Sequence, residues 1–374
     1  MKFLQKRILL LFIFLFACTF SGFTQEFTTL QGKIIDKKID SLYIHKVTGD
    51  VRLNRITVPV KDGQFRYKTK ENAVEAYEVI YPYQHQRGAW KAVTFFMEPG
   101  KIQFSLHPEK PSKNVIQGGK WNDEFNHFTQ VAEKRFRNPA RKLSKELNAS
   151  KSKDTSLLKS KMDSLKKGFV SHHTDYIKES TNPVSYYLLY ENIESNRFNI
   201  PLNLLEKSFQ KHSEQLPNHP YSSVIQTILN AKEQIEVGNR YIDFQAPDLN
   251  GEQKRLSNLI DGKIALLNLW ASWCGPCIRK SREMVPIFKK YHSDEFTMIG
   301  VAREFDNTNR LEKALQREEF PWKNLVDIDD KHNIWRKYDI PFTGGGMFLI
   351  DKEGKILAVN PTVKEVRKIL TNRL

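Results

Sequence analysis

Two cysteines, Cys274 and Cys277, are the residues whose type and spacing most clearly point to chemistry. The apolar run 264–270 before them predicts a buried strand, and the sequence after them predicts a helix that continues to about Tyr291. A thiolate at a helix N-terminus is stabilised by the partial positive end of the dipole and by free backbone N–H groups. We therefore expect the pKa of Cys274 to fall from about 8.5 towards 7 or lower.

This arrangement predicts thiol–disulfide exchange. Cys274 is expected to be the exposed, attacking sulfur, and Cys277, one helical turn further on, is expected to resolve the mixed disulfide. The residues around them support the motif: Trp273 flanks it, Gly275 lets a partner's backbone approach, and Pro276 keeps the sulfurs within bonding distance. We expect no cofactor beyond this dithiol.

The alternative interpretation of a C-x-x-C pair is half of a structural zinc site. Such a site needs four ligands, and the sequence contains no second cysteine pair and no H-x-x-x-H element. His292 stands alone at the far end of the predicted helix. The three cysteines are also too few for a disulfide framework. We therefore expect redox chemistry and no metal.

Strands and helices alternate beyond residue 238. A second strand is predicted at 296–301 and a helix at 307–318; strands at 347–350 and 355–359 form a hairpin, and a last helix covers 363–374. A strand–helix–strand unit followed by a hairpin and a helix predicts an α/β fold of thioredoxin type for residues 238–374.

Residues 238–374 resemble the TlpA- and ResA-like family of bacterial envelope thiol–disulfide oxidoreductases, within the thioredoxin superfamily. The resemblance is carried by Asp243-Phe244, Gly262-Lys263, the segment 267–277 and the segment 348–356. It implies reduction of disulfides in exported proteins, including the preparation of apocytochromes for haem attachment, and a membrane thiol–disulfide relay as electron donor. Gly-Pro between the cysteines resembles the reducing thioredoxin pattern, so we expect a potential below roughly −200 mV.

The segment before the hairpin departs from the family's pattern. Thioredoxin-like sites usually carry a cis-proline just before the strand that leads into Phe348, but this place falls on Gly345 within Gly344-Gly345-Gly346. Pro341 could serve only if the loop is longer. We expect three glycines to leave the substrate surface beside the sulfurs more open and more flexible.

Two further departures concern the helix after the motif. Pro286 lies nine residues after Cys277 instead of the usual five, which indicates one extra helical turn. The two places where relatives carry a buried acid hold Asn268 and Lys280. Glu283 is the nearest carboxylate on the helix, but its spacing points it away from Cys277. For Glu283 and Lys280, a part in proton transfer or thiol activation and a plain surface charge both stay open.

Residues 26–118 predict an antiparallel β-sandwich, since short aromatic and β-branched runs such as 42–44 and 65–67 are separated by glycine-containing turns. Their end, 118–125, resembles the exit of a β domain of unknown function that precedes such modules in some Gram-negative envelope proteins. Residues 119–237 predict amphipathic helices that break at Asn182-Pro183 and Leu216-Pro217.

Two features of the helical region could be mistaken for sites. Adjacent helical positions face different ways, so we interpret His172-His173 as exposed polar residues rather than as a metal pair. The tyrosines at 186, 187 and 190 are interpreted as packing residues.

The N-terminus predicts export. Basic residues precede the apolar run 8–17, which is far shorter than the roughly 20 residues of a membrane span, so residues 1–24 are predicted to be a signal peptide. Leu15-Phe16-Ala17-Cys18 resembles a lipobox, and lipidation of Cys18 and ordinary cleavage near Thr24 both stay open. Either outcome places the protein in the periplasm or cell envelope of a Gram-negative bacterium, soluble or lipid-anchored.

The net charge of +16 does not by itself indicate nucleic acid binding, because the basic residues are spread along the chain and are not clustered with aromatics. Two other functions stay open beside disulfide reduction. A thiol peroxidase would carry Thr or Ser where this sequence has Ala271. An envelope binding or scaffold protein would depend mainly on residues 26–237, where no catalytic motif is found.

Overall fold

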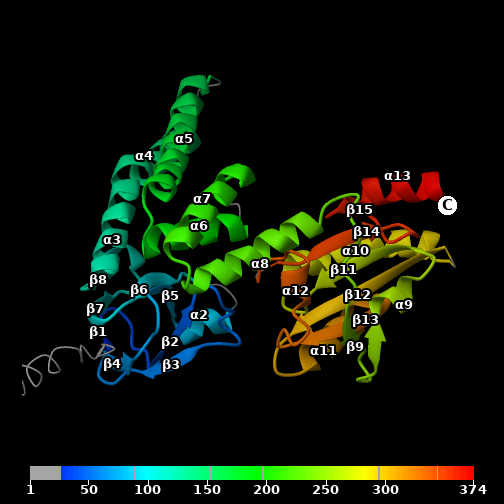
Figure 1. Cartoon of the computed structure of the whole chain (residues 1–374), viewed down its shortest axis with the longest axis horizontal. Helices are drawn as coiled ribbons and strands as arrows, with labels where there is room; N and C mark the ends of the chain where they lie inside the picture. The colour runs from blue at the N-terminus through cyan, green and yellow to red at the C-terminus, as the bar shows by residue number, and fades with distance from the viewer. Residues whose placement is uncertain (1–26, 88–89, 151–153, 196–197, 294, 343) are drawn as a thin grey trace, which may run out of the picture.

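The computed structural model describes residues 27–374 except 88–89, 151–153, 196–197, 294 and 343. The predicted signal peptide and Cys18 lie outside the described residues. An N-terminal β unit and a group of helices form one half of the molecule, and α8 runs from this half to the C-terminal unit (Figure 1). In the part of the chain that the structure describes, no helix is both long and apolar enough to cross a bilayer.

The β unit consists of two four-stranded sheets with a shared core. One sheet has the order β4-β1-β7-β8 and the other β3-β2-β5-β6. The strands are β1 Thr28–Ile34, β2 Ser41–Lys46, β3 Ile56–Pro59, β4 Gln64–Thr69, β5 Glu75–Ile80, β6 Val93–Met97, β7 Gly100–Leu106 and β8 Val115–Gln117, with short helices at Pro82–Gln86 (α2) and Pro111–Lys113. Buried side chains from both sheets, such as Leu30, Phe104, Ile44 and Phe95, form one apolar cluster between them.

One strand pair differs from the prediction of an antiparallel sandwich. β1 and β7 are parallel, with Leu30 opposite Ile102. Parallel neighbours need a long crossover connection, and the chain between them supplies it by forming the whole second sheet and β4. The other pairs in the two sheets are antiparallel.

The helices that follow form one group. They are α3 Lys120–Ala132, a π-helical turn at Glu133–Arg137, α4 Asn138–Ala149, α5 Ser156–Glu179, α6 Pro183–Ser195, α7 Leu202–Gln215 and α8 Pro220–Gln234. Of these, α3, α6 and α8 pack against the sheet β3-β2-β5-β6 on the side away from the sandwich core. Ala76 and Phe96 of the sheet share a buried cluster with Tyr187 and Tyr221. The predicted breaks at Asn182-Pro183 and Leu216-Pro217 are confirmed, because α6 begins at Pro183 and α7 ends at Gln215.

The interpretation of His172 and His173 as exposed residues is wrong. The ring of His172 stacks on Phe128 with centroids 4.4 Å apart, and the ring of His173 lies 4.3 Å from that of Phe169. Burial lowers the pKa of His173 to about 4. Both rings therefore serve as aromatic packing between α3 and α5.

The C-terminal unit is a five-stranded sheet, ordered β13-β12-β11-β14-β15, with helices on both faces. Helices α10, α11 and α13 contribute to the buried cluster on one face, and α9 and α12 contribute to the cluster on the other. The elements are β9 Gln245–Pro247, β10 Gln253–Arg255, α9 Leu256–Ile260, β11 Ile264–Trp270, α10 Gly275–Tyr291, β12 Phe296–Glu304, α11 Asn309–Glu318, β13 Lys323–Ile328, α12 Ile334–Lys337, β14 Gly346–Ile350, β15 Ile356–Val359 and α13 Val363–Arg373.

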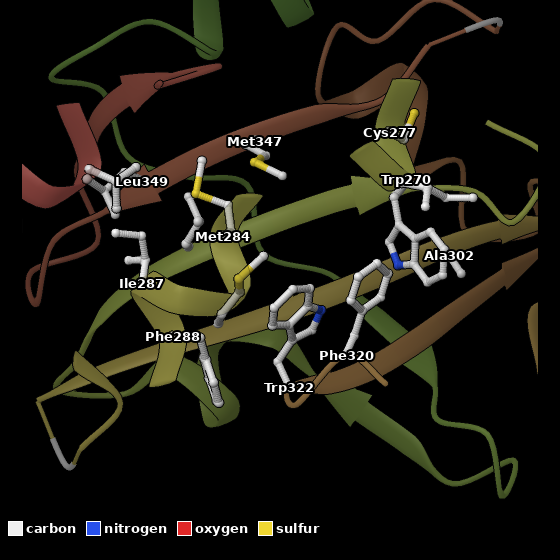
Figure 2. Packing of buried hydrophobic residues seen from close by; sticks show 14 of the residues in the cluster. Trp270, Cys277, Met284, Ile287, Phe288, Ala302, Phe320, Trp322, Met347 and Leu349 are labelled. Atoms are coloured by element: carbon white, nitrogen blue, oxygen red, sulfur yellow. The ribbon is translucent and has the colours of Figure 1, made fainter. Parts of the chain in front are cut away.

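Helix α10 is anchored by its apolar face. Met284, Ile287 and Phe288 of α10 lie in one buried cluster with Trp322, which precedes β13, and Leu349 of β14, and Cys277 lies at the other end of the same helix (Figure 2). Pro286 lies within α10 and does not end it. The strand 264–270 and the helix ending at Tyr291 agree with the sequence prediction, whereas β13 was not predicted.

Candidate active site

Cys274 and Cys277 form a disulfide at the start of α10, with their Cα atoms 5.3 Å apart. Cys274 is the N-cap residue, and the backbone N–H of Cys277 donates to Cys274 Sγ at 3.3 Å. Gly275 and Pro276 are the first helical residues, where the missing N–H of proline costs no hydrogen bond. Helix geometry thus fixes one sulfur at the helix end and the second one turn inside, as the spacing predicts. The expectation that Cys274 is exposed is wrong for the disulfide form, because Cys274 is 6% exposed and Cys277 9%.

The disulfide borders a pocket of about 400 Å³. Lys280 and Glu283 of α10 line this pocket together with both cysteines. Glu283 and Lys280 are both exposed, and their places on α10 bring them to the edge of the cavity; whether either takes part in proton transfer stays a prediction. The structure thus brings a cation and a carboxylate to the same cavity as the sulfurs.

Gly345 lies directly against the disulfide. A Cβ atom on Gly345 would be 2.4 Å from the carbonyl oxygen of Leu269 and 2.8 Å from Cys277 Sγ, both too close for any side chain. Gly344 has room for a Cβ, and its carbonyl oxygen accepts a bond of 2.9 Å from Trp335 Nε1. Among the described residues, no peptide bond is cis. Close approach of the backbone to the sulfur, rather than an open surface, therefore explains the glycine at 345.

The buried position at Asn268 carries no acid. Asn268 is 2% exposed, lines the pocket, and its Nδ2 donates to Ser281 Oγ at 2.9 Å. A neutral, hydrogen-bonded pair thus occupies the place where the family usually has a carboxyl group.

A different buried carboxylate, which the sequence analysis missed, lies next to the motif. Glu304 at the end of β12 accepts from the backbone N–H of Ser272 at 2.8 Å and from its hydroxyl at 2.7 Å. Burial raises the pKa of Glu304. The sequence prediction ended this strand at Val301; continuing the strand to the charged pair Arg303-Glu304 would have indicated two charges in the core.

Trp273 is held by residues that the sequence analysis also missed. Its Nε1 donates to the carbonyl oxygen of Arg303 at 3.1 Å, and the guanidinium of Arg52 lies 4.0 Å from the centroid of its ring. Arg303 is fully buried and pairs with Asp330 and Asp50. Asp50 and Arg52 belong to the N-terminal β unit, so both units contribute to the surroundings of the dithiol.

Comparison with known proteins finds relatives for both of these units. Residues 237–359 match the AhpC/TSA family, and residues 28–125 match a domain of unknown function, DUF4369. The thiol-disulfide oxidoreductase ResA of Bacillus cereus is 30% identical over 36% of this chain and 75% of its own length. ResA of Bacillus subtilis is 32% identical over 36% of this chain and 74% of its own. A solved thiol-disulfide oxidoreductase from Bacteroides fragilis is 25% identical over 36% of this chain and all of its own, with a TM-score of 0.34.

The fold of the C-terminal unit and its helix-capping dithiol define a thiol–disulfide oxidoreductase of the thioredoxin superfamily. The chain belongs to the family of ResA-type thiol–disulfide oxidoreductases. It carries in addition the N-terminal DUF4369 unit and the helices between the two. Its partners are accordingly molecules that bear disulfides.

Proposed function

We propose that this enzyme reduces disulfides in exported proteins, with Cys274 as the attacking sulfur and Cys277 as the resolving sulfur. The observation that carries the proposal is the position of Cys274 Sγ, which caps α10 and borders the pocket beside Gly345. Helix N-termini stabilise negative charge, and the bond from the Cys277 N–H is directed at the sulfur that would carry it.

In the reduced enzyme, the thiolate of Cys274 attacks one sulfur of the substrate disulfide, which forms a mixed disulfide and releases one substrate thiolate. The thiolate of Cys277 then attacks Cys274 Sγ, which forms the 274–277 disulfide and releases the second substrate thiolate. Two electrons pass to the substrate, whose thiolates take up protons from solvent. A dithiol donor must then reduce the enzyme again, and no other cofactor is part of the proposal.

The reducing direction is supported by Gly275-Pro276, which matches the thioredoxin pattern. Arg279 and Lys280 add positive charge to the pocket that Cys274 borders, which favours the thiolate of Cys274 and hence its attack, but not the direction of exchange. We expect a midpoint potential below roughly −200 mV, on the reducing side of the scale on which thioredoxin lies near −270 mV and the oxidant DsbA near −120 mV. Titration against glutathione buffers, read by tryptophan fluorescence, measures it; a value near −120 mV would reverse the direction.

The predicted signal peptide supports a site of action in the periplasm or envelope, where a membrane thiol–disulfide relay would supply electrons and Cys18 could carry a lipid. Preparation of apocytochromes for haem attachment is part of this proposal and rests on the family resemblance alone. Labelling with radioactive palmitate in cells expressing the wild type and Cys18→Ser tests the lipid.

The decisive test is a trap for the mixed disulfide. Cys277→Ser should accumulate covalent adducts with disulfide-bearing proteins, because no second sulfur remains to release them. Cys274→Ser is the matched control and should accumulate none. Recovery of no adduct with Cys277→Ser, from cells in which it is exported, would contradict exchange with proteins.

A further inference from the structure

The loop between β2 and β3 carries two buried residues at its centre although it joins two neighbouring strands. Hairpin loops normally lie on the surface, yet Asp50 and Val51 are 5% and 3% exposed. The C-terminal unit, which lies beside the β unit (Figure 1), contacts Asp50 and Arg52, whereas Val47 at the start of the loop packs against the helices. The loop, residues 47–55, therefore contacts the C-terminal unit, and this contact is not needed to connect β2 to β3.

The first part of this contact is a buried ion network. Asp50 Oδ2 lies 2.9 Å from Nη2 of Arg303, whose side chain is fully buried. Asp330 pairs with the same guanidinium. Burial alone would raise the pKa of Asp50, but Arg52 and Arg303 outweigh it and hold that pKa below its ordinary value. Buried charges persist where they are paired and hydrogen-bonded, so the docking of the loop is specific.

The second part of the contact is made by Arg52 and reaches the two segments beside the dithiol. Its guanidinium lies over the ring of Trp273, which directly precedes Cys274, and 4.3 Å from the centroid of the Phe305 ring. Its Nη2 donates to the carbonyl oxygen of Phe342 at 2.9 Å. Arg303 Nη1 donates to the same carbonyl at 2.8 Å.

Phe342 begins the segment that ends at Gly345 and Gly346, and Gly345 contacts Cys277 Sγ. Arg52 thus contacts a residue on each side of the disulfide, Trp273 on one side and Phe342, close in sequence to Gly345, on the other. The pocket at the disulfide is lined by β11, α10 and the segment 344–347, and by no residue of the β unit among those described. The loop therefore shapes the rim of the site and does not block it.

We propose that loop 47–55 of the N-terminal β unit, through Arg52 and Asp50, is a specificity element of the oxidoreductase that holds Trp273, Phe342 and the glycines 344–346 in place to receive a polypeptide carrying the disulfide. Arg52 acts through these residues and is a positioning residue. A polypeptide must lie on both sides of the dithiol to bring its disulfide to Cys274, whereas a small disulfide needs only the sulfur. The proposal assigns a role to the DUF4369 unit, and it rests on the proposed function of disulfide reduction.

The test compares two disulfides and uses the full mature chain. The reduced enzyme is mixed with insulin or with hydroxyethyl disulfide, and the second-order rate constant of oxidation is followed by tryptophan fluorescence. Arg52→Ala should lower the rate constant with insulin at least tenfold and change that with hydroxyethyl disulfide less than twofold. Arg66→Ala, an exposed arginine on β4, is the matched control and should change neither.

Arg52→Lys keeps the charge but loses the planar group that stacks on Trp273 while bonding Phe342, so it should resemble Arg52→Ala. Asp50→Asn preserves the shape of the loop and should lower the rate constant with insulin about threefold. If Arg52→Ala does not fold, Asp50→Asn takes its place in the test. Equal loss with both disulfides, an unchanged rate with insulin, or full rescue by Arg52→Lys would overturn the inference. Failure of the proposed function would instead appear in the wild type, as exchange with neither disulfide, and would remove the inference with it.

Discussion

Gly345 offers the sharpest test of the site's geometry, because the added atom is defined and a matched neighbour exists. In Gly345→Ala the new methyl group would lie 2.4 Å from the carbonyl oxygen of Leu269 and 2.8 Å from Cys277 Sγ. The carbonyl belongs to β11, the central strand of the sheet, which is buried along its whole length. A backbone carbonyl in this strand cannot move aside as the end of a flexible side chain could, so the segment 344–346 or the disulfide must shift.

Overpacking of this kind costs typically about 1–3 kcal/mol, and we expect Gly345→Ala to lose that amount of unfolding free energy. In Gly344→Ala the methyl group would meet its nearest neighbour, the carbonyl oxygen of Pro341, at 3.7 Å, which is an ordinary contact. Neither glycine has a positive φ, so the two substitutions differ in space and not in backbone strain. We expect Gly344→Ala to change the free energy by less than about 0.5 kcal/mol.

Both variants are measured in the oxidised form by urea unfolding, followed by tryptophan fluorescence of the C-terminal unit. The reduction potential of each is then determined, since a displaced Cys277 changes the balance between disulfide and dithiol. Gly345→Ala should shift the potential while Gly344→Ala keeps the wild-type value. Equal stability and equal potential for the two variants would refute the close contact between Gly345 and the disulfide.

Three further predictions follow from buried polar groups. Burial lowers the pKa of His173 to about 4, so at pH 5 the unfolded chain binds a proton at this residue that the folded chain does not bind. The free energy of unfolding should therefore fall by about 2 kcal/mol between pH 7.5 and 5 because of His173, and His173→Gln should remove this fall. Urea titrations at the two pH values measure it, and an equal fall in the wild type and the variant would contradict the prediction. Glu304→Ala leaves the Ser272 N–H and hydroxyl without their acceptor and should lower the free energy of unfolding by about 1–3 kcal/mol. Glu304→Gln keeps an acceptor oxygen and should lower it less in the same assay. Equal losses in the two variants would argue against these hydrogen bonds. Asn268→Asp introduces a carboxyl group into the pocket of the dithiol, so the pH profile of the rate of Cys274 alkylation should gain a second inflection that Asn268→Ala lacks. A single inflection in both variants would show that ionisation at position 268 does not affect the reactivity of Cys274.

Local pattern was enough to predict the parts of the fold that build the dithiol site. The strand 264–270 is an unbroken apolar run ended by the motif, and its bounds match β11. The helix after it follows from proline near its start and apolar residues at helical spacing, and α10 indeed ends at Tyr291. β13 was missed because its apolar run, Leu325-Val326, is too short to distinguish a strand from a loop without its neighbour β12.

Other features depend on contacts that no local pattern carries. α6 was expected to have one apolar face, yet its tyrosines and leucines are buried on all sides because the helix lies between a sheet and the helices α3, α5, α7 and α8. The parallel pairing of β1 with β7 joins segments about seventy residues apart. At the site, Arg52 meets the carbonyl of Phe342 across 290 residues of sequence. Sequence therefore predicts the sulfurs and the helix that presents them, and tertiary structure supplies the residues that hold them.

The strands β5 and β6 of the sheet β3-β2-β5-β6 are covered on both faces, and this determines where the chain can be divided. Asn122 of α3 bonds both the N–H and the carbonyl of Phe96 on the edge strand β6, and the hydroxyl of Tyr221 on α8 accepts from the N–H of Ala76 on β5. A fragment cut after β8 would leave an apolar sheet face bare and two backbone groups of β6 without partners. Such a fragment should aggregate when expressed alone, whereas one that runs through α8 retains its cover. Studies of the N-terminal half in isolation therefore require the helices as well as the strands.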